Sequence, residues 1–206
     1  MVRDRLTQCA SEGLLVKFHG ERAHAGTPED GRNPAAAIAA LALYTQQLPA
    51  AQGIHLCMIV HMHEGNLDFG ISPGDGEIAF TLRTESDSEL DDMEKNLRRH
   101  AEQLAEQYGL HVDFSIYDPF PATINDPQCA EKVRHAAAKL GLTLAPMDQP
   151  WRPSEDFGWY TKVRPGAMFY VGNGVNWPMP HQPGYDFNDH ILQTAASVFL
   201  KLAETG

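Results

Sequence analysis

The feature that most constrains the fold is the order of the elements predicted between residues 14 and 117. Apolar and alternating runs predict four strands, at residues 14–20, 54–63, 76–84 and 111–117. Two helices are predicted between them, an alanine-rich one over residues 33–48 that ends at Pro49 and an amphipathic one opened by a Ser86–Glu89 capping box. The order strand, helix, strand, strand, helix, strand is that of the split βαβ, or ferredoxin-like, unit, an antiparallel sheet with both helices on one face.

The rest of the chain has a different pattern. Two helices are predicted, over residues 126–140 and from about residue 188 onward, and Leu192, Val198 and Phe199 of the second should face inward. Residues 167–171 predict one short strand. With two helices and few strands, this part is too sparse to cover both faces of a sheet, so we expect it to need another chain segment. The predicted organisation is a lead-in at residues 1–13, a βαββαβ domain at residues 14–121 and a C-terminal segment at residues 122–206.

The composition restricts the partners and the compartment. The chain has 27 Asp and Glu against 16 Lys and Arg, a formal charge of -11, which argues against nucleic acid or an anionic membrane as a partner. No run approaches the roughly 18 apolar residues of a membrane span, and residues 1–13 lack the apolar core of a signal peptide. The three cysteines, an odd number without metal-like spacing, favour reduced thiols and a cytoplasmic location.

Two groups of histidines are candidates for chemistry. His24 lies among small residues (RAHAGTP, residues 22–28), which allow a backbone segment or a ligand to approach closely, and a neutral imidazole can donate a hydrogen bond to an oxyanion. The alternative is a loop histidine packed on its own turn. His61 and His63 lie two apart on a predicted strand and share one face; a solvated face is favoured over a shared metal because a third ligand is not apparent.

Three loops in the last third of the chain each allow two interpretations. Residues 154–157 (SEDF) either begin a helix, with acids in the first turn, or orient a ligand or cation. Residues 172–174 (GNG) form either a plain turn or a backbone cradle for an anion. His181 is either a loop residue or a metal ligand, with Asp186 and Asp189 as acceptors for its second ring nitrogen.

Taken in order, these motifs resemble those of the aminoacylase and carboxypeptidase type of zinc-dependent amidohydrolases and peptidases. The similarity is carried by seven stretches over nearly the whole chain, at residues 20–28, 31–36, 81–84, 154–157, 165–169, 172–174 and 181–189. In that family the βαββαβ unit is a lid and dimerisation domain inserted into a catalytic α/β domain. The resemblance therefore implies an α/β protein with an α+β lid, followed here by the C-terminal portion of the catalytic domain.

The resemblance also implies roles for individual residues. His181 becomes a metal ligand, and His24 becomes the residue that reaches a neighbouring subunit's site to stabilise the tetrahedral oxyanion. The substrate cleft would be lined by five residues of two loops: Ser154, Glu155, Asp156, Asn173 and Gly174. The implied partners are a second copy of the chain, bound through the lid, and a small peptide or N-acyl amino acid as substrate.

Two departures from the family pattern matter. The family carries a Gly-Gly-x-Ala-x-Asn-x-Ile-Pro stretch before the third lid strand, whereas residues 65–73 read GNLDFGISP, with Gly70 in place of the asparagine that recognises the substrate carboxylate. The family's other metal ligands and its general-base glutamate lie upstream of the lid, but this chain reaches the first lid strand by Leu14. A catalytic zinc takes three protein ligands, so one histidine cannot hold it.

The sequence thus predicts the lid and C-terminal part of an amidohydrolase or peptidase that uses zinc, or another divalent metal, to activate water. Because the metal cluster is incomplete, we expect the isolated chain to be inactive. Two alternatives remain open. One is a non-catalytic dimerisation or binding module, and the other is a subunit completed by a separate N-terminal, metal-binding polypeptide.

Overall fold

The computed structural model describes residues 1–48, 53–178 and 180–204. The contacts within the chain divide it into two compact units. The sheet unit comprises Cys9–Ala122 and Arg152–Ser154, and the helical unit comprises Met1–Gln8, Thr123–Trp151 and Glu155–Gly206. Among the described residues, no helix is both long and apolar enough to cross a membrane.

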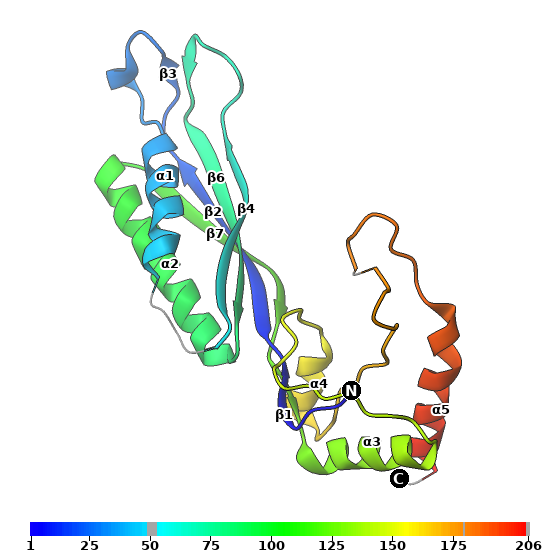
Figure 1. The fold of residues 1–206 in the computed structure, drawn as a ribbon. Helices are drawn as coiled ribbons and strands as arrows, with labels where there is room; N and C mark the ends of the chain where they lie inside the picture. The colour runs from blue at the N-terminus through cyan, green and yellow to red at the C-terminus, as the bar shows by residue number, and fades with distance from the viewer. Residues whose placement is uncertain (49–52, 179, 205–206) are drawn as a thin grey trace. The chain divides into compact units, whose positions relative to one another are not determined.

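The sheet unit contains a four-stranded antiparallel sheet in the order β4-β6-β2-β7. Its strands are β2 (Ala10–His19), β4 (His55–Glu64), β6 (Asp75–Thr84) and β7 (His111–Phe120). Two helices, α1 (Ala35–Tyr44) and α2 (Asp87–Tyr108), lie on one face of this sheet (Figure 1). The predicted order of elements and the ferredoxin-like fold are therefore confirmed.

The boundaries of several elements differ from the sequence prediction. Strand β7, predicted over residues 111–117, continues to Phe120. Strand β2 begins at Ala10 rather than Leu14, because residues 10–13 pair with β6 although they lack an apolar alternation. Helix α1 ends at Tyr44 and continues as the 3-10 turn η2 (Thr45–Gln47). Pro49, at which the helix was predicted to end, lies outside the described residues.

The core of the sheet unit follows from the two-residue period of its strands. Alternate residues of the two central strands are fully buried, and they are Leu14, Val16 and Phe18 on β2 and Ile78, Phe80 and Leu82 on β6. Helix α2 faces them with buried Leu90, Met93 and Leu97, and α1 with Ile38 and Leu41. Each such side chain contributes about 1.5–3 kcal/mol when fully buried, which makes this layer the main stabilising contact of the unit.

Helix α2 begins and ends on signals that are visible in the sequence. The Ser86 hydroxyl accepts a hydrogen bond from the Glu89 N–H at 3.3 Å, as the capping box predicts. At the other end Gly109 has a φ of 65°, a left-handed conformation that glycine adopts without strain, and its N–H reaches the last carbonyls of the helix.

The helical unit combines a two-stranded sheet with helices. Strand β1 (Arg5–Gln8) pairs with β8 (Thr123–Asn125), so part of the predicted lead-in is a strand. The helices are α3 (Pro127–Lys139), α4 (Phe157–Val163) and α5 (Leu192–Ala203), the last preceded by the 3-10 turn η3 (Asp189–Ile191). The two helices predicted here are confirmed, and α3 begins where Asp126 Oδ1 accepts the Cys129 N–H at 2.9 Å.

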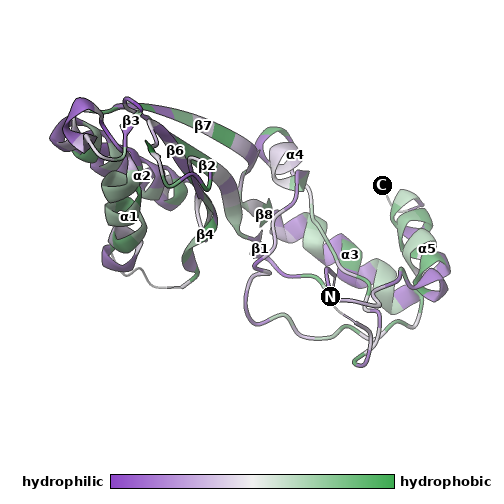
Figure 2. Cartoon of the chain, turned by 90° about the horizontal axis from the view of Figure 1, so that it is seen from above, coloured by the Kyte–Doolittle hydropathy of each residue, from purple (hydrophilic) through white to green (hydrophobic). Residues whose placement is uncertain are grey.

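Two predictions for this unit were wrong. Residues 167–171 do not form a strand. The backbone of this extended segment pairs, among the described residues, with Met1 and Val2, which is too little to make a sheet. Helix α5, which is largely hydrophobic in Figure 2, buries Val198 but leaves Leu192 and Phe199 54% and 61% exposed. The periodicity of α5 identifies an apolar face correctly, but the described residues provide too little surface to cover it.

Glu12 is an exception in the apolar layer of the sheet unit. It lies on the same face of β2 as Leu14, and its Oε1 atom is buried without a hydrogen-bond partner among the described residues. The pKa of the Glu12 carboxyl is raised from 4.5 to about 7, chiefly by burial and then by the negative charges of Glu94 and Asp91, which outweigh the opposite effect of Arg98. The folded chain therefore retains a proton on Glu12 that the unfolded chain releases between these two values.

The first prediction concerns this proton. Because the folded state binds it more tightly, Glu12 makes the chain less stable as the pH rises from about 4.5 to about 7, and the full loss is present above that window. Glu12→Gln abolishes the titration, so the variant should gain melting temperature relative to the parent chain at pH 8 and gain less, or nothing, at pH 5. Thermal unfolding followed by circular dichroism measures this, with Glu102→Gln on the exposed face of α2 as the control. An equal shift at both pH values would contradict the role of Glu12.

Candidate functional site

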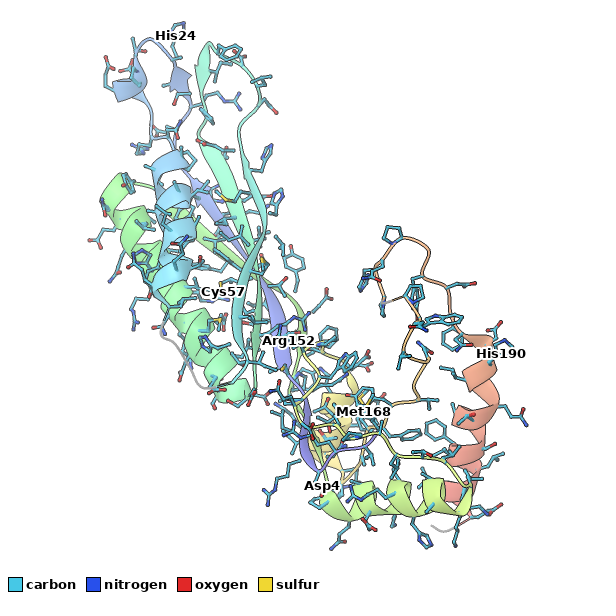
Figure 3. All side chains as sticks on the ribbon, in the orientation of Figure 1. Asp4, His24, Cys57, Arg152, Met168 and His190 are labelled. Carbon is cyan, nitrogen blue, oxygen red and sulfur yellow. The ribbon has the colours of Figure 1, made fainter. Side chains whose placement is uncertain are left out.

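His24 lies at the tip of the sheet unit, on the short strand β3 (Ala23–His24), which pairs with β5 (Ile71–Ser72) (Figure 3). Its Nδ1 atom accepts a hydrogen bond from the Gly26 N–H at 2.9 Å. A ring nitrogen that accepts a hydrogen bond carries no proton, so the neutral imidazole has its proton on Nε2. Because the side chain is exposed, this Nε2–H is available to a ligand.

The small residues around His24 have a structural reason. A Cβ atom on Gly26 would lie 3.1 Å from His24 Nδ1, tighter than an ordinary contact, so glycine leaves room for the hydrogen bond that fixes the ring. The neighbouring Ala25 N–H donates to the carbonyl of Gly70 at 3.0 Å. Gly70, which occupies the family's asparagine position, therefore lies next to the His24 loop but offers only backbone groups, and its own N–H donates to Asp68 Oδ1.

Ser154 has a structural role in the sheet unit. Its hydroxyl donates to the Cys9 carbonyl at 2.8 Å and accepts from Arg83 Nη1 at 3.0 Å, and Arg83 Nη1 also donates to the Arg152 carbonyl. Arg83 was not predicted to interact with this segment, since 71 residues separate it from Ser154 and nothing local in the sequence links the two. The Ser154 hydroxyl thus uses its proton and one acceptor position in hydrogen bonds within the protein.

Glu155 and Asp156 belong to the helical unit, where both side chains are exposed. Asp156 is the residue that precedes α4, but its side chain does not form a capping hydrogen bond. A helix does begin at the end of residues 154–157, but the acids lie before its first turn rather than in it, so the helix-start interpretation is correct only in part. The two carboxylates remain accessible to a ligand.

The GNG turn contains one polar atom that the fold does not satisfy. Asn173 Oδ1 is buried and has no hydrogen-bond partner in the described part of the chain, whereas the Asn173 carbonyl accepts from Asn188 Nδ2 at 3.4 Å. Gly174 has a φ of 96°, in the region that favours glycine. Asn188, which is 8% exposed, also accepts the His190 N–H and so ties this turn to the start of the last helix.

His181 is exposed and has a φ of 69°. Nearby, the Trp177 indole N–H donates to the Asp186 carbonyl at 2.8 Å, and Asp186 Oδ1 accepts the N–H of Phe187. In the chain as described, no group of three or more His, Cys, Asp or Glu side chains is arranged to hold a metal ion. Among the residues that the structure describes, His181 therefore does not belong to such a group.

Other histidines lie on the open face of the sheet, where they pair with acids. His61 Nε2 is 3.0 Å from Glu77 Oε1, and the His61 ring stacks on that of His63. His111 and Asp113 form a His-x-Asp pair on β7, with His111 Nε2 3.2 Å from Asp113 Oδ1. All these groups are partly exposed, which agrees with the interpretation of this face as solvated.

The structure does not bring the predicted site residues of the sheet unit together. The Ser154 hydroxyl bonds to Cys9, just before β2, whereas His24 follows the other end of this strand. A ten-residue strand is about 30 Å long, so within one copy of the chain the two side chains are too far apart to contact the same small ligand. The other predicted residues, from Glu155 to His181, belong to the helical unit.

Comparison with known proteins gives a consistent assignment. Residues 10–205 match Peptidase family M20/M25/M40. The chain is 26% identical to an N-acetylcysteine deacetylase of Bacillus subtilis, over 91% of this chain and 50% of the relative. It is 25% identical to an IAA-amino acid hydrolase of Arabidopsis thaliana, over 98% of this chain and 49% of the relative. The chain thus spans about half the length of these curated relatives.

A solved structure agrees at the level of the fold. A Bacillus subtilis protein described as a dinuclear metal binding peptidase from the M20 family superposes with a TM-score of 0.74 at 22% identity, over 98% of this chain and 51% of the other. The resemblance inferred from the motifs is therefore confirmed by a match over nearly the whole sequence. This chain belongs to Peptidase family M20/M25/M40.

Proposed function

We propose that the chain is the lid and C-terminal part of an amidohydrolase that hydrolyses the amide bond of N-acyl amino acids or small peptides. The observation that carries this proposal is the hydrogen bond from the Gly26 N–H to His24 Nδ1, in a chain that matches the family. This bond leaves the proton of the neutral imidazole on the exposed Nε2. Two relatives, named N-acetylcysteine deacetylase and IAA-amino acid hydrolase, act by their names on amides of amino acids, which supports this substrate class.

The role of His24 follows from its protonation. Hydrolysis of an amide passes through a tetrahedral intermediate with a negative oxygen, and a preorganised N–H donor stabilises that charge more than the neutral carbonyl. With Nδ1 occupied by a backbone donor, His24 can present Nε2–H without first losing or gaining a proton. We propose that it donates this bond in the active site of a partner subunit.

The described residues do not by themselves fit a catalytic metal. A catalytic zinc requires three protein ligands, and the described residues contain no suitable cluster. We propose that His181 supplies one ligand to zinc or another divalent metal. The remaining ligands and the general base would come from a polypeptide segment other than these 206 residues. The relatives, about twice as long as the matched region, have room for such a segment.

Four of the predicted cleft residues keep that role in the proposal, and they are Glu155, Asp156, Asn173 and Gly174. Asn173 has the most direct support, since its buried Oδ1 atom lacks a partner among the described residues and could accept a hydrogen bond from a substrate N–H. Ser154 differs, because its hydroxyl already holds Arg83 and the Cys9 carbonyl. We propose that Ser154 fixes the segment that precedes the cleft residues.

The cysteines support a reducing compartment, and we propose the cytoplasm. Cys9, Cys57 and Cys129 form no disulfide with one another. Burial raises the pKa of the Cys9 thiol to about 11 and that of Cys57 to about 12, so both stay protonated and unreactive at neutral pH.

The second prediction tests His24 in an enzyme that carries this chain together with its metal-binding half. His24→Ala should lower kcat on an N-acyl amino acid by about 10²–10³-fold, the usual cost of removing one oxyanion donor. Metal content should not change. His135→Ala, an exposed histidine of α3, is the matched control and should retain full activity. If His24→Ala keeps near-normal kcat, the proposed role is wrong.

We also propose that the chain forms a homodimer through β4. This ten-residue strand lies at an edge of the sheet, and four of its apolar side chains are exposed: Leu56, Met58, Val60 and Met62, at 40–64%. A long edge strand with exposed apolar groups is prone to pair with another chain. Pairing of two copies would cover it, and an exposed His24 could then reach the partner's site.

The third prediction follows from this edge. Met58→Lys with Val60→Lys places two charges per chain on β4 and should convert a dimer of the 22.8 kDa chain into a monomer while the circular dichroism spectrum is retained. Light scattering coupled to size exclusion measures the mass. Leu67→Lys, at a position that is 92% exposed outside the strands, is the control and should stay dimeric. A parent chain that is monomeric at all concentrations would exclude the proposal.

A further inference from the structure

A cavity of about 530 Å³ in the helical unit differs in charge from the rest of the chain. It lies among β1, β8, the start of α3 and the end of α4, and is lined by Arg5, Ile124, Asn125, Asp126, Pro127, Thr161, Lys162, Val163, Arg164 and Pro165. Three of these residues are cationic and one is anionic, although the whole chain has a formal charge of -11. The volume lies within the roughly 300–1,000 Å³ typical of small-ligand sites.

The walls of the cavity are held in place by buried hydrogen bonds. Asn125 is 1% exposed; its Oδ1 accepts the Met168 N–H at 2.8 Å, and its Nδ2 donates to the carbonyls of Met168 and Arg3. The next residue, Asp126, donates its N–H to the carbonyl of Gly166 at 2.8 Å. These bonds join the strand on one side of the cavity to the segment after α4 on the other, so the cavity exists before a ligand binds.

The three cations come from separate parts of the unit. Arg5 is the first residue of β1, is exposed and forms no ion pair within the described chain. Arg164 follows α4 and donates only weakly, at 3.3 Å, to the carbonyl of its neighbour Val163. Lys162 lies on α4, with its Nζ 5.3 Å from the centre of the Trp159 ring. Like charges repel one another, so their convergence on one cavity favours a counter-ion.

The only acid lining this cavity is already used by the fold. Asp126 Oδ1 accepts the Cys129 N–H at the start of α3, and this backbone hydrogen bond lowers the pKa of the carboxyl, so it is ionised at neutral pH. Since Asp126 caps the helix and Pro127 has no N–H, the cations rather than the helix terminus attract an anion. Asp126 opposes that attraction.

We propose that this cavity binds a small anion with two or more negative charges, of the phosphate or polycarboxylate class. Guanidinium groups bind both kinds of oxyanion through paired N–H donors, and an ammonium adds a point charge. A ligand bound only to the folded chain stabilises it by RT ln(1 + L/Kd), where L is the concentration of free ligand, so the stabilisation rises with the logarithm of the ligand concentration. The site is separate from the residues proposed for hydrolysis.

Calorimetric titration of the metal-free chain with pyrophosphate, and separately with citrate, tests the proposal. At low ionic strength we expect saturable binding of one anion per chain, absent with sodium chloride at matched ionic strength. Arg5→Gln with Arg164→Gln should weaken binding roughly tenfold or more. Arg22→Gln, which removes the same charge from an exposed position of the sheet unit, should leave it unchanged. Binding of only one of the two probes identifies the class of anion.

A gain-of-affinity variant separates binding from folding. Asp126→Asn removes the acid from the cavity, while asparagine caps a helix as well as aspartate does. Removal of a unit charge about 6 Å from the ligand should tighten binding about threefold. A misfolded variant cannot bind more tightly. If neither probe binds beyond the chloride control, or if both the arginine and Asp126 variants bind as the parent does, the proposal is overturned.

Discussion

The pairing of β2 with both β6 and β7 is the interaction on which the sheet unit depends. All ten residues of β2 have partners on β6, and most also have partners on β7, so this strand fixes the register of the whole sheet. A shift by one residue would turn Leu14, Val16 and Phe18 away from the helices. The same register sets where β2 ends, and therefore where the chain turns outward to present His24 beyond the sheet.

The fold of the chain matches its family, but the described residues supply too few metal ligands for a catalytic metal site. The chain presents one group that we propose for catalysis, the Nε2–H of His24, and one proposed metal ligand, His181. No described residues complete a metal cluster, and the chain spans about half of its curated relatives. Exposed apolar groups on β4 and α5 are consistent with the same conclusion, since both surfaces would be covered by further polypeptide.

Features with a local cause were predictable from the sequence. The alternation of β2 and β6, the capping box at Ser86 and the helix start at Asp126 each depend on residues within a few positions. The small residues around His24 also indicated a close approach, and the structure identifies it as the hydrogen bond from Gly26.

Features that depend on distant residues were not predictable. The pairing of β3 with β5 joins positions almost 50 residues apart, and two-residue strands have no periodicity to detect. The bond between Arg83 and Ser154 spans 71 residues, and it occupies a hydroxyl that the motif alone assigned to a substrate. Residues 167–171 have strand-like composition, but strand formation needs a partner strand. This segment has an isolated bridge from Phe169 to Val2, while Met168 bonds to the side chain of Asn125.

The central claim is that this chain carries one part of a metal site whose other ligands lie elsewhere. Zinc content by plasma mass spectrometry, measured on the purified 206-residue chain after dialysis against excess zinc and then buffer, tests it most directly. We predict far less than one zinc per chain, no amidase turnover, and no change on His181→Ala. One or two tightly bound zinc ions per chain, lost on His181→Ala and accompanied by turnover of an N-acyl amino acid, would contradict the account.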